Sequence, residues 1–183
     1  MDKRVARGQA SKAKLKEAFL ELVQTEEPGD ITVVELCEKT GLNRSTFYAH
    51  YEYMGQLISE VLMESIGRVI EGYGTQWELP LEDGGVDRAA IAVYLRRLLS
   101  DPTVSRFCTC SESASYRDFI IRAHIELTLG PSLDPVRYSA AYIHNAGVLS
   151  FLFEWLKNGP SVPEETVIEI IHEFSKVMYR PMK

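Results

Sequence analysis

Residues 31–62 read ITVVELCEKTGLNRSTFYAHYEYMGQLISEVL, and this stretch decides the fold. Its first signal is Thr32, followed three positions later by Glu35. In such a capping box the threonine hydroxyl accepts a hydrogen bond from a free backbone N–H at the start of a helix, and the glutamate reaches back to the cap. The stretch therefore predicts a helix that begins after Thr32 and ends near Thr40.

A second short helix is expected after a tight turn. Gly41 can adopt the left-handed conformation that closes a helix end, and Asn43 offers a side-chain oxygen that can cap the next helix. That helix is expected to run from Arg44 to about Tyr51. Two short helices joined by a glycine turn form a helix-turn-helix, whose second helix has the width of the DNA major groove.

The side chains of these two helices divide into an inner and an outer set. The inner set is apolar and can fix the crossing angle of the helices: Val33, Leu36, Cys37, Leu42 and Phe47. The outer set belongs to the second short helix and its end, and has donors for phosphates or base edges: Arg44, Ser45, Thr46, Tyr48 and His50. The alternative is a local role for each residue, in which Thr32 and Asn43 only cap and Tyr48 only packs.

The rest of the chain has a helical pattern. Apolar residues recur with helical spacing nearly everywhere, and no alternating strand pattern is convincing. The other expected helices span about residues 11–24, 53–73, 87–100, 102–110, 113–129, 136–158 and 163–179. We therefore expect an all-α fold of about nine helices.

Two domains are expected. Residues 1–52 would form a helix-turn-helix DNA-binding domain of three helices, and residues 53–183 a second, larger helical domain. The helix expected at 53–73 is long enough to link them. Residues 74–85, GTQWELPLEDGG, are rich in glycine, proline and acidic residues, so a loop is expected there.

The composition is that of an ordinary globular protein, with 183 residues, 45% hydrophobic and 25% charged. No apolar run approaches the roughly 18 residues that span a bilayer, and the N-terminus lacks the apolar stretch of a signal peptide. We therefore expect a cytoplasmic protein without membrane contact. The three cysteines, Cys37, Cys108 and Cys110, lack zinc-ligand spacing, so reduced thiols and no metal are expected.

Charge is unevenly distributed along the chain. The formal net charge of −6 by itself opposes binding to a polyanion. Residues 1–16, however, hold six basic residues and one acidic residue, so the remainder is more acidic than the total. A basic end on an acidic body suits a protein that meets DNA with one end, although a solvated basic tail would have the same composition.

In residues 31–62 the sequence resembles the tetracycline-repressor (TetR) family of transcriptional regulators. The likeness rests on Ile31-Thr32-Val33, the turn Thr40-Gly41-Leu42, the run Ser45-Thr46-Phe47-Tyr48, the pair His50-Tyr51, and Leu57, in this order. The resemblance covers about the first quarter to third of the chain. It implies a TetR-like fold, binding of a palindromic operator as a homodimer, and repression that a small-molecule effector relieves.

The resemblance also implies roles for individual residues. Those that would hold DNA phosphates are Thr32, Thr46, Tyr48 and His50, and those that would reach base edges are Asn43, Arg44 and Ser45. The chain departs from the family pattern at Met54, where a phosphate-binding lysine is usual, and at Tyr53, where a small capping residue is common. The basic arm of residues 3–16, with Lys12 as its expected DNA contact, would compensate for the missing lysine.

The helix expected at 136–158 is apolar nearly all round, so it must be covered on two sides. The last helix has an apolar stripe that can pack beside it. Two such helices from each subunit would form the four-helix dimer interface that the resemblance implies, with Gly147, Phe151, Trp155, Ile170 and Phe174 as expected interface residues. Alternatively, the core of a monomer absorbs all of them.

The helices in between form the region in which family members often hold an effector whose binding moves the DNA-reading domains. The residues that could line such a pocket are Tyr94, Tyr116, Phe119, His124 and Tyr142, although each could equally be a packing residue. The stretch AGVLSFLFEWLKNGPSVPEETV at 146–167 also resembles, more loosely, regulators of dihydroxyacetone kinase. Some of these act through a partner protein.

Rival interpretations belong to other classes of function. An enzyme would draw on the four histidines and the cysteines, but no nucleophile–base motif, phosphate loop or metal spacing accompanies them, so neither catalysis nor a cofactor is expected. A redox role for Cys108 and Cys110 has only Arg106 nearby to favour a thiolate. A co-regulator that acts through a protein partner, with little DNA binding of its own, is favoured by Met54 and by the acidic total charge.

Overall fold

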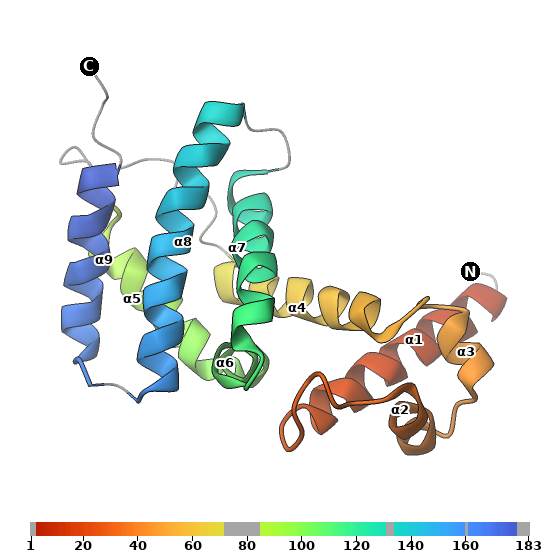
Figure 1. Cartoon of the computed structure of the whole chain (residues 1–183). Helices are drawn as coiled ribbons and strands as arrows, with labels where there is room; N and C mark the ends of the chain where they lie inside the picture. The colour runs from red at the N-terminus through yellow and green to blue at the C-terminus, as the bar shows by residue number, and fades with distance from the viewer. Residues whose placement is uncertain (1–2, 72–84, 131–133, 160, 179–183) are drawn as a thin grey trace. The chain divides into compact units, whose positions relative to one another are not determined.

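The computed structural model describes residues 3–71, 85–130, 134–159 and 161–178 (Figure 1). Within these ranges every regular element is an α-helix. The helices are α1 (Lys3–Leu22), α2 (Val33–Thr40), α3 (Arg44–Tyr48), α4 (Met54–Ile70), α5 (Arg88–Ser100), α6 (Pro102–Thr109), α7 (Ser113–Leu129), α8 (Pro135–Lys157) and α9 (Glu164–Met178). The expected all-α fold is confirmed.

The chain forms two compact units, residues 1–64 and 65–183. The first unit contains α1, α2, α3 and the beginning of α4, and the second contains the end of α4 and helices α5–α9. Helix α4 therefore supplies residues to both units. The functional division into residues 1–52 and 53–183 stays a prediction.

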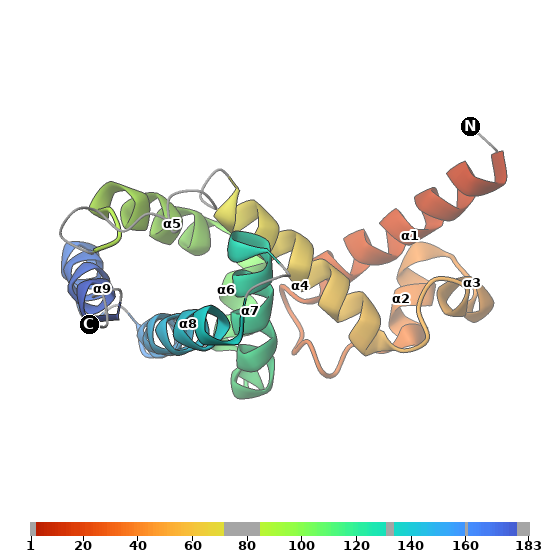
Figure 2. The same ribbon diagram turned by 90° about the horizontal axis from the view of Figure 1, so that it is seen from above.

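In the first unit, α1, α2 and α3 pack on one another around a small apolar core (Figure 2). The side chains that are fully buried on these helices are Leu15, Phe19, Leu36 and Phe47. Of the expected inner set, Cys37 is also buried, whereas Val33 and Leu42 are half-buried. The core that sets the crossing angle is therefore centred on Leu36 and Phe47.

Both ends of α2 follow from the sequence signals. Glu35 N donates to Thr32 Oγ1 at 3.3 Å, and Thr32 N donates to Glu35 Oε2 at 2.7 Å, so both halves of the capping box are present. Gly41 ends the helix with a φ of 68°, a conformation that residues with a Cβ adopt only with strain. The predicted bounds of α2 are confirmed.

Two bounds in the first unit differ from the expectation. Helix α1 begins at Lys3 instead of near residue 11, because residues 3–10 hold good helix formers and no proline. Helix α3 ends at Tyr48 instead of Tyr51. There, His50 N and Tyr51 N both donate to Phe47 O at 2.9 Å, and the buried Tyr51 ring packs 5.6 Å from that of Phe47.

In the second unit, α7 and α8 lie side by side and α9 packs beside α8 (Figures 1 and 2). Helix α5 packs against α9, and α6 contacts α5, α7 and α8. Large apolar side chains that are fully buried in this unit are Leu95, Phe107, Ile125, Leu152 and Val167. The bounds of these helices lie within about two residues of those expected.

The segment that enters α5 is fastened to α9. Val86 N donates to Ser175 Oγ at 2.8 Å, and His172 Nδ1 donates to Val86 O at 2.7 Å. Gly85 is needed for this approach, because a Cβ there would lie 2.6 Å from His172 Cε1. The remainder of the loop expected at 74–85 lies outside the described residues.

Membrane-spanning helices and metal-ion sites were also sought among the described residues. None of the described helices is long and apolar enough to cross a membrane. Across the same part of the chain, no group of three or more His, Cys, Asp or Glu side chains is placed to hold a metal ion.

Candidate nucleic-acid interface

The side chain of Asn43 organises the turn between α2 and α3. Its Oδ1 atom accepts hydrogen bonds from Thr46 N at 2.8 Å, Ser45 Oγ at 2.7 Å and Thr46 Oγ1 at 2.8 Å. Asn43 therefore caps α3, as its position in the sequence predicts. Because the oxygen is committed to these three donors, the Nδ2 amide is the group that Asn43 can offer to DNA, and it can only donate.

The outer side of α3 presents hydrogen-bond donors to solvent. Arg44 and Ser45 are exposed, Thr46 is half-buried, and Tyr48 is 57% exposed. Phe47 points the other way into the core, and its ring meets that of Tyr48 edge-on at 5.4 Å. Guanidinium, hydroxyl and phenol groups in this arrangement can read base edges and hold phosphates.

His50 follows α3 and is tied to α1. Its Nε2 atom lies 2.8 Å from Ser11 Oγ, and Ser11 Oγ donates to Gly8 O at 2.9 Å. Because the hydroxyl hydrogen is used for Gly8, Nε2 is the donor to Ser11 and carries a hydrogen. With this bond intact, the predicted phosphate contact of His50 has only Nδ1 available, and Nδ1 can donate only when the ring is protonated.

Thr32 has partners within its own capping box. Its Oγ1 atom donates to Glu35 Oε2 at 2.7 Å, in addition to the backbone bond from Thr32 N. These two hydrogen bonds hold the pKa of Glu35 below its usual value, so a charged carboxylate lies at the N-terminus of α2. This carboxylate stands where the family resemblance implies a DNA phosphate, and the phosphate contact of Thr32 stays a prediction.

Lys12 is engaged with α4. Its Nζ atom lies 2.7 Å from Glu60 Oε2 and 5.4 Å from the centre of the Tyr51 ring. Lys16, one turn further along α1, lies 3.2 Å from Glu60 Oε1 and 2.6 Å from Glu64 Oε1. These four charged residues, which we call the α1–α4 ion-pair cluster, neutralise one another, so a DNA contact by Lys12 requires its pair with Glu60 to break.

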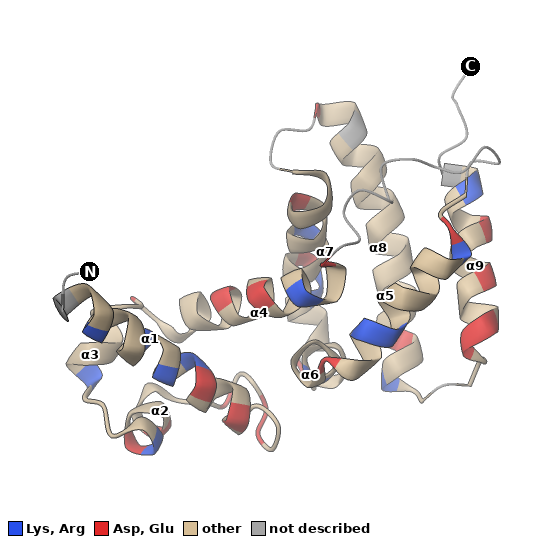
Figure 3. Ribbon diagram, turned by 180° about the vertical axis from the view of Figure 1, so that it is seen from behind, with Lys and Arg blue, Asp and Glu red and all other residues tan. Residues whose placement is uncertain are grey.

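Arg7 and Lys14 are two further cations of α1. Both are exposed, neither forms an ion pair with the described residues, and their seven-residue spacing places them on the same side of the helix. Figure 3 shows the basic segments of α1 and α3 and the acidic segments of α4. The sequence contained a signal for this pairing. Lys12 and Lys16 are four residues apart, and so are Glu60 and Glu64, so each pair lies on one side of its helix.

The start of α4 is built without the small cap that is usual in the family. Gln56 Oε1 accepts a hydrogen bond from Glu52 N at 2.7 Å, which ties the first turn of α4 to the residue before its N-cap position. The ring of Tyr53 lies over Gly55, where a Cβ would stand 2.8 Å from Tyr53 Cε2. Met54 is half-buried, whereas Tyr53 is 60% exposed, which makes its phenol a candidate DNA contact that the motif did not predict.

Comparison with known proteins gives a result for structure only. Neither a scan against protein-family profiles nor a search of curated proteins finds a match. Among solved structures, the TetR family repressor AlkX from Dietzia sp., implicated in biodegradation of n-alkanes, has a TM-score of 0.56 at 13% identity, over 91% of this chain and 94% of that chain. A TetR transcriptional regulator from Rhodococcus sp. RHA1 has a TM-score of 0.56 at 15% identity, over 96% and 99%.

The chain has a TetR-like fold. The dihydroxyacetone kinase operon activator DhaS matches as well, with a TM-score of 0.52 at 14% identity over 93% of this chain and 96% of that chain. The fold implied by residues 31–62 is thus confirmed and extends over nearly the whole chain.

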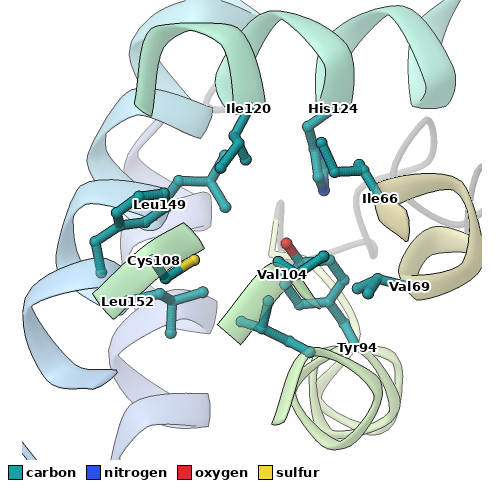
Figure 4. A pocket seen from close by; sticks show the side chains of 11 residues that line it. Ile66, Val69, Tyr94, Val104, Cys108, Ile120, His124, Leu149 and Leu152 are labelled. Atoms are coloured by element: carbon teal, nitrogen blue, oxygen red, sulfur yellow. The ribbon is translucent and has the colours of Figure 1, made fainter. Parts of the chain in front are cut away.

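A cavity lies in the second unit of the TetR-like fold (Figure 4). Its volume of about 10 Å³ has room for little more than one water molecule. The residues that line it are Ile66, Val69, Tyr94, Leu98, Val104, Cys108, Ile120, His124, Leu149, Leu152 and Phe153. Tyr94 and His124 were expected in a pocket, and the apolar lining was not specified by the sequence.

The other three residues expected in the pocket lie elsewhere. The ring of Tyr116 packs edge-on against Phe107 at 4.7 Å. Tyr142 donates through its hydroxyl to Asp118 Oδ1 at 2.7 Å, in an exposed contact between α7 and α8, and Phe119 is half-buried on α7. Helical spacing places aromatic residues on a helix face, but only the packing of α5 to α8 decides which faces meet the cavity.

The groups of the cavity wall are electrically neutral at pH 7. Burial, with a smaller contribution from His144, lowers the pKa of His124 to about 4. Burial also raises the pKa of Cys108 to about 12 and raises that of Tyr94. The Cys108 thiol therefore stays protonated, which opposes the redox role considered from the sequence.

The residues expected at the dimer interface on α8 and α9 differ in how they pack within the subunit, and the interface itself stays a prediction. Trp155 is 7% exposed and its Nε1 donates to Val162 O at 2.9 Å, so it belongs to the core of its own subunit. A Cβ on Gly147 would lie 2.9 Å from Phe174 Cζ of the same chain, and Phe151 and Phe174 are half-buried. The large apolar residues that α8 and α9 expose are Val136, Ile143, Ile170 and Val177.

Proposed function

We propose that this protein is a DNA-binding transcriptional regulator. The proposal rests on α3, a short helix that Asn43 caps, that buried Phe47 holds on the core, and that exposes Arg44 and Tyr48. In helix-turn-helix proteins the second helix of the motif enters the major groove, and its first residues contact base edges. The TetR-like fold and the repressors among its structural neighbours support this function.

The electrostatics of the first unit are compatible with DNA in spite of the net charge of −6. Arg44 is an exposed guanidinium at the start of α3, and Arg7 and Lys14 add two cations on α1. Each phosphate that such a cation meets releases condensed counterions, so binding weakens as salt rises. We expect Arg44 to favour guanine, whose O6 and N7 atoms suit a bidentate guanidinium.

A homodimer is proposed from the exposed apolar residues of the last two helices. Ile143 on α8 and Ile170 on α9 are 57% and 42% exposed, and the two helices pack beside each other, so both can contribute to one apolar contact with a second subunit. A two-fold dimer presents two copies of α3, and a palindromic operator matches such a pair.

Control by a small molecule is proposed through the cavity. Helix α4 buries Leu57 and Val61 in the first unit and lines the cavity with Ile66 and Val69 in the second. A ligand that displaces Ile66 or Val69 therefore acts on a helix that also completes the core of the DNA-reading unit. We propose a cytoplasmic repressor without catalytic activity, which leaves its operator when the effector binds.

The test is binding to the DNA upstream of the protein's own gene, measured by fluorescence anisotropy at several salt concentrations. We expect specific binding with a negative salt slope, and Arg44→Ala should weaken it about tenfold or more because a bidentate base contact is lost. Arg96→Ala, which removes another exposed arginine on α5, is the matched control and should bind normally. Wild-type binding no tighter than to unrelated DNA of equal length would contradict the proposal.

A co-regulator that acts through a protein partner is the second candidate. It is favoured by the α1–α4 ion-pair cluster, which occupies Lys12, and by Met54 at the start of α4. One of the structural neighbours is an operon activator. For this candidate, the anisotropy experiment would show no specific binding by the protein alone, and a DNA complex would form only with the partner present.

A further inference from the structure

The cavity of the second unit has a chemistry that selects among ligands by charge. We propose that it binds a small, electrically neutral, mainly apolar molecule with one hydrogen-bonding group, and that it rejects carboxylates and phosphates of the same size. The regulatory meaning of such a ligand rests on the proposed function, whereas the binding itself can be measured without DNA.

The wall of the cavity argues against a charged ligand. Most of the lining side chains are aliphatic, and among the described residues no Lys, Arg, Asp or Glu belongs to the lining. The imidazole of His124 is neutral at pH 7, because burial lowers its pKa to about 4. An anion in this space would lose its hydration without gaining a counter-charge, and an unpaired buried charge is far more costly than an unpaired buried dipole.

Polar atoms nevertheless reach the cavity. In Figure 4 the hydroxyl oxygen of Tyr94, the sulfur of Cys108 and a ring nitrogen of His124 point toward the space between the aliphatic side chains. These residues come from α5, α6 and α7, and the rings of Tyr94 and His124 meet edge-on at 5.5 Å. Since burial raises the pKa of Tyr94, its phenol stays protonated and uncharged, as a neutral ligand requires.

The present size of the cavity bears on how a ligand enters. A volume of about 10 Å³ is far smaller than a molecule with six or more heavy atoms, so binding must part the lining side chains. Ile66 and Val69 of α4 belong to that lining. The energy needed for opening lowers the apparent affinity and links ligand binding to the position of these side chains.

The experiment uses the full-length protein at pH 7.5 without DNA and two matched pairs of probes. Hexan-1-ol is compared with hexanoate, and 4-ethylphenol with 4-ethylbenzoate, so that each pair differs mainly in charge. At about ten times Kd we expect the neutral probes to raise Tm by about 3–6 °C, as saturable binding to the native state requires. In methyl NMR spectra the signals of Val104 and Leu152 should shift with the neutral probes.

Two variants locate the hydrogen bond. Tyr94→Phe keeps the ring and removes the hydroxyl, and it should weaken binding of the neutral probes about tenfold. Tyr142→Phe removes a tyrosine hydroxyl outside the cavity and is the matched control, with unchanged binding expected.

Three results would overturn the inference: no saturable binding of either neutral probe, equal binding of the carboxylates, or equal effects of the two tyrosine variants. None of these measurements involves DNA, so failure of the ligand inference and failure of the DNA-binding proposal are separate outcomes.

Discussion

The amide side chain of Asn43 offers two chemically different ends, one to the protein and one to solvent. Its oxygen accepts three hydrogen bonds inside the turn, and its nitrogen is available only as a donor. Bidentate recognition of adenine by asparagine needs an accepting oxygen as well as a donating nitrogen. A donor alone suits the acceptor atoms that purines present in the major groove.

Substitution of Asn43 can separate these two roles. Asn43→Ala removes the cap and should lower the free energy of unfolding by about 1 kcal/mol. Asn43→Asp keeps an oxygen acceptor but loses the amide donor and adds a negative charge, so stability should be retained while DNA binding is lost. Urea unfolding and anisotropy measure the two effects, and normal DNA binding by Asn43→Asp would rule out the proposed contact.

The α1–α4 ion-pair cluster predicts a pH dependence of stability. Burial opposes ionisation of Glu60, but hydrogen bonds from Lys12 and Lys16 prevail and lower its pKa from 4.5. A carboxyl with a lowered pKa in the folded state stabilises the protein above its unfolded pKa, and this contribution is lost as pH falls through the folded value.

We therefore expect Glu60→Gln to lower the free energy of unfolding by about 0.5–1 kcal/mol at pH 7. The difference from wild type should shrink as pH falls below 4.5 and vanish once Glu60 is protonated in both the folded and the unfolded states. Urea unfolding at pH 7 and at a series of lower pH values measures it. Glu38→Gln, at an exposed position of α2, is the control and should show no such pH-dependent difference, and a constant deficit in Glu60→Gln would contradict the ionic origin.

At the scale of elements, local chemistry made the helices predictable where caps are present. Thr32, Gly41 and Asn43 mark helix ends by bonds within a few residues, so the sequence contains the necessary information. The lining of the cavity depends instead on how α4 to α8 pack, which no local signal encodes. The start of α1 was missed although Asp2, a residue type favoured at helix N-caps, precedes Lys3, because the apolar stripe used to place the helix begins only at Leu15.

The stability of Gly147→Ala shows whether packing between α8 and α9 or helix propensity has the larger effect at this position. Alanine inside a helix is favoured over glycine by about 1 kcal/mol, so propensity predicts that Gly147→Ala stabilises. The new Cβ, however, would lie 2.9 Å from Phe174 Cζ, and the Phe174 ring is already stacked on His144 at 5.7 Å. We expect this close contact to offset most of the gain from helix propensity, so that Gly147→Ala stabilises clearly less than propensity alone predicts.

Thermal unfolding of two further variants decides between the causes. Gly67→Ala in α4, where no atom lies within 4 Å of the added Cβ, should stabilise as propensity predicts. Phe174→Leu should remove most of the penalty of Gly147→Ala in the double variant. If Gly147→Ala stabilises as much as Gly67→Ala, the close packing of α8 on α9 is wrong.

At the scale of the whole molecule, the pattern of α8 predicted that two sides must be covered, but not which side meets the chain's own core. Trp155 packs into the core of its own subunit, whereas Gly147 is exposed beside Phe174 of the same chain, so its place in the interface stays a prediction. The large exposed apolar residues are Val136 and Ile143 on α8 and Ile170 and Val177 on α9. We propose that they contribute to an interface that closes under two-fold symmetry, and such interfaces usually bury about 1,200–2,000 Å² in total.

Ile143→Asp should therefore abolish the dimer, because two carboxylates would be buried near one another in an apolar interface. Sedimentation velocity is expected to show a monomer with native helical content. Val93→Asp introduces the same charge at a 40% exposed valine of α5 and should leave the dimer intact. Because a palindromic operator gains affinity from two linked α3 helices, Ile143→Asp should also weaken operator binding while leaving binding to a half-site nearly unchanged. A dimer that survives Ile143→Asp would place the interface on another face of the second unit.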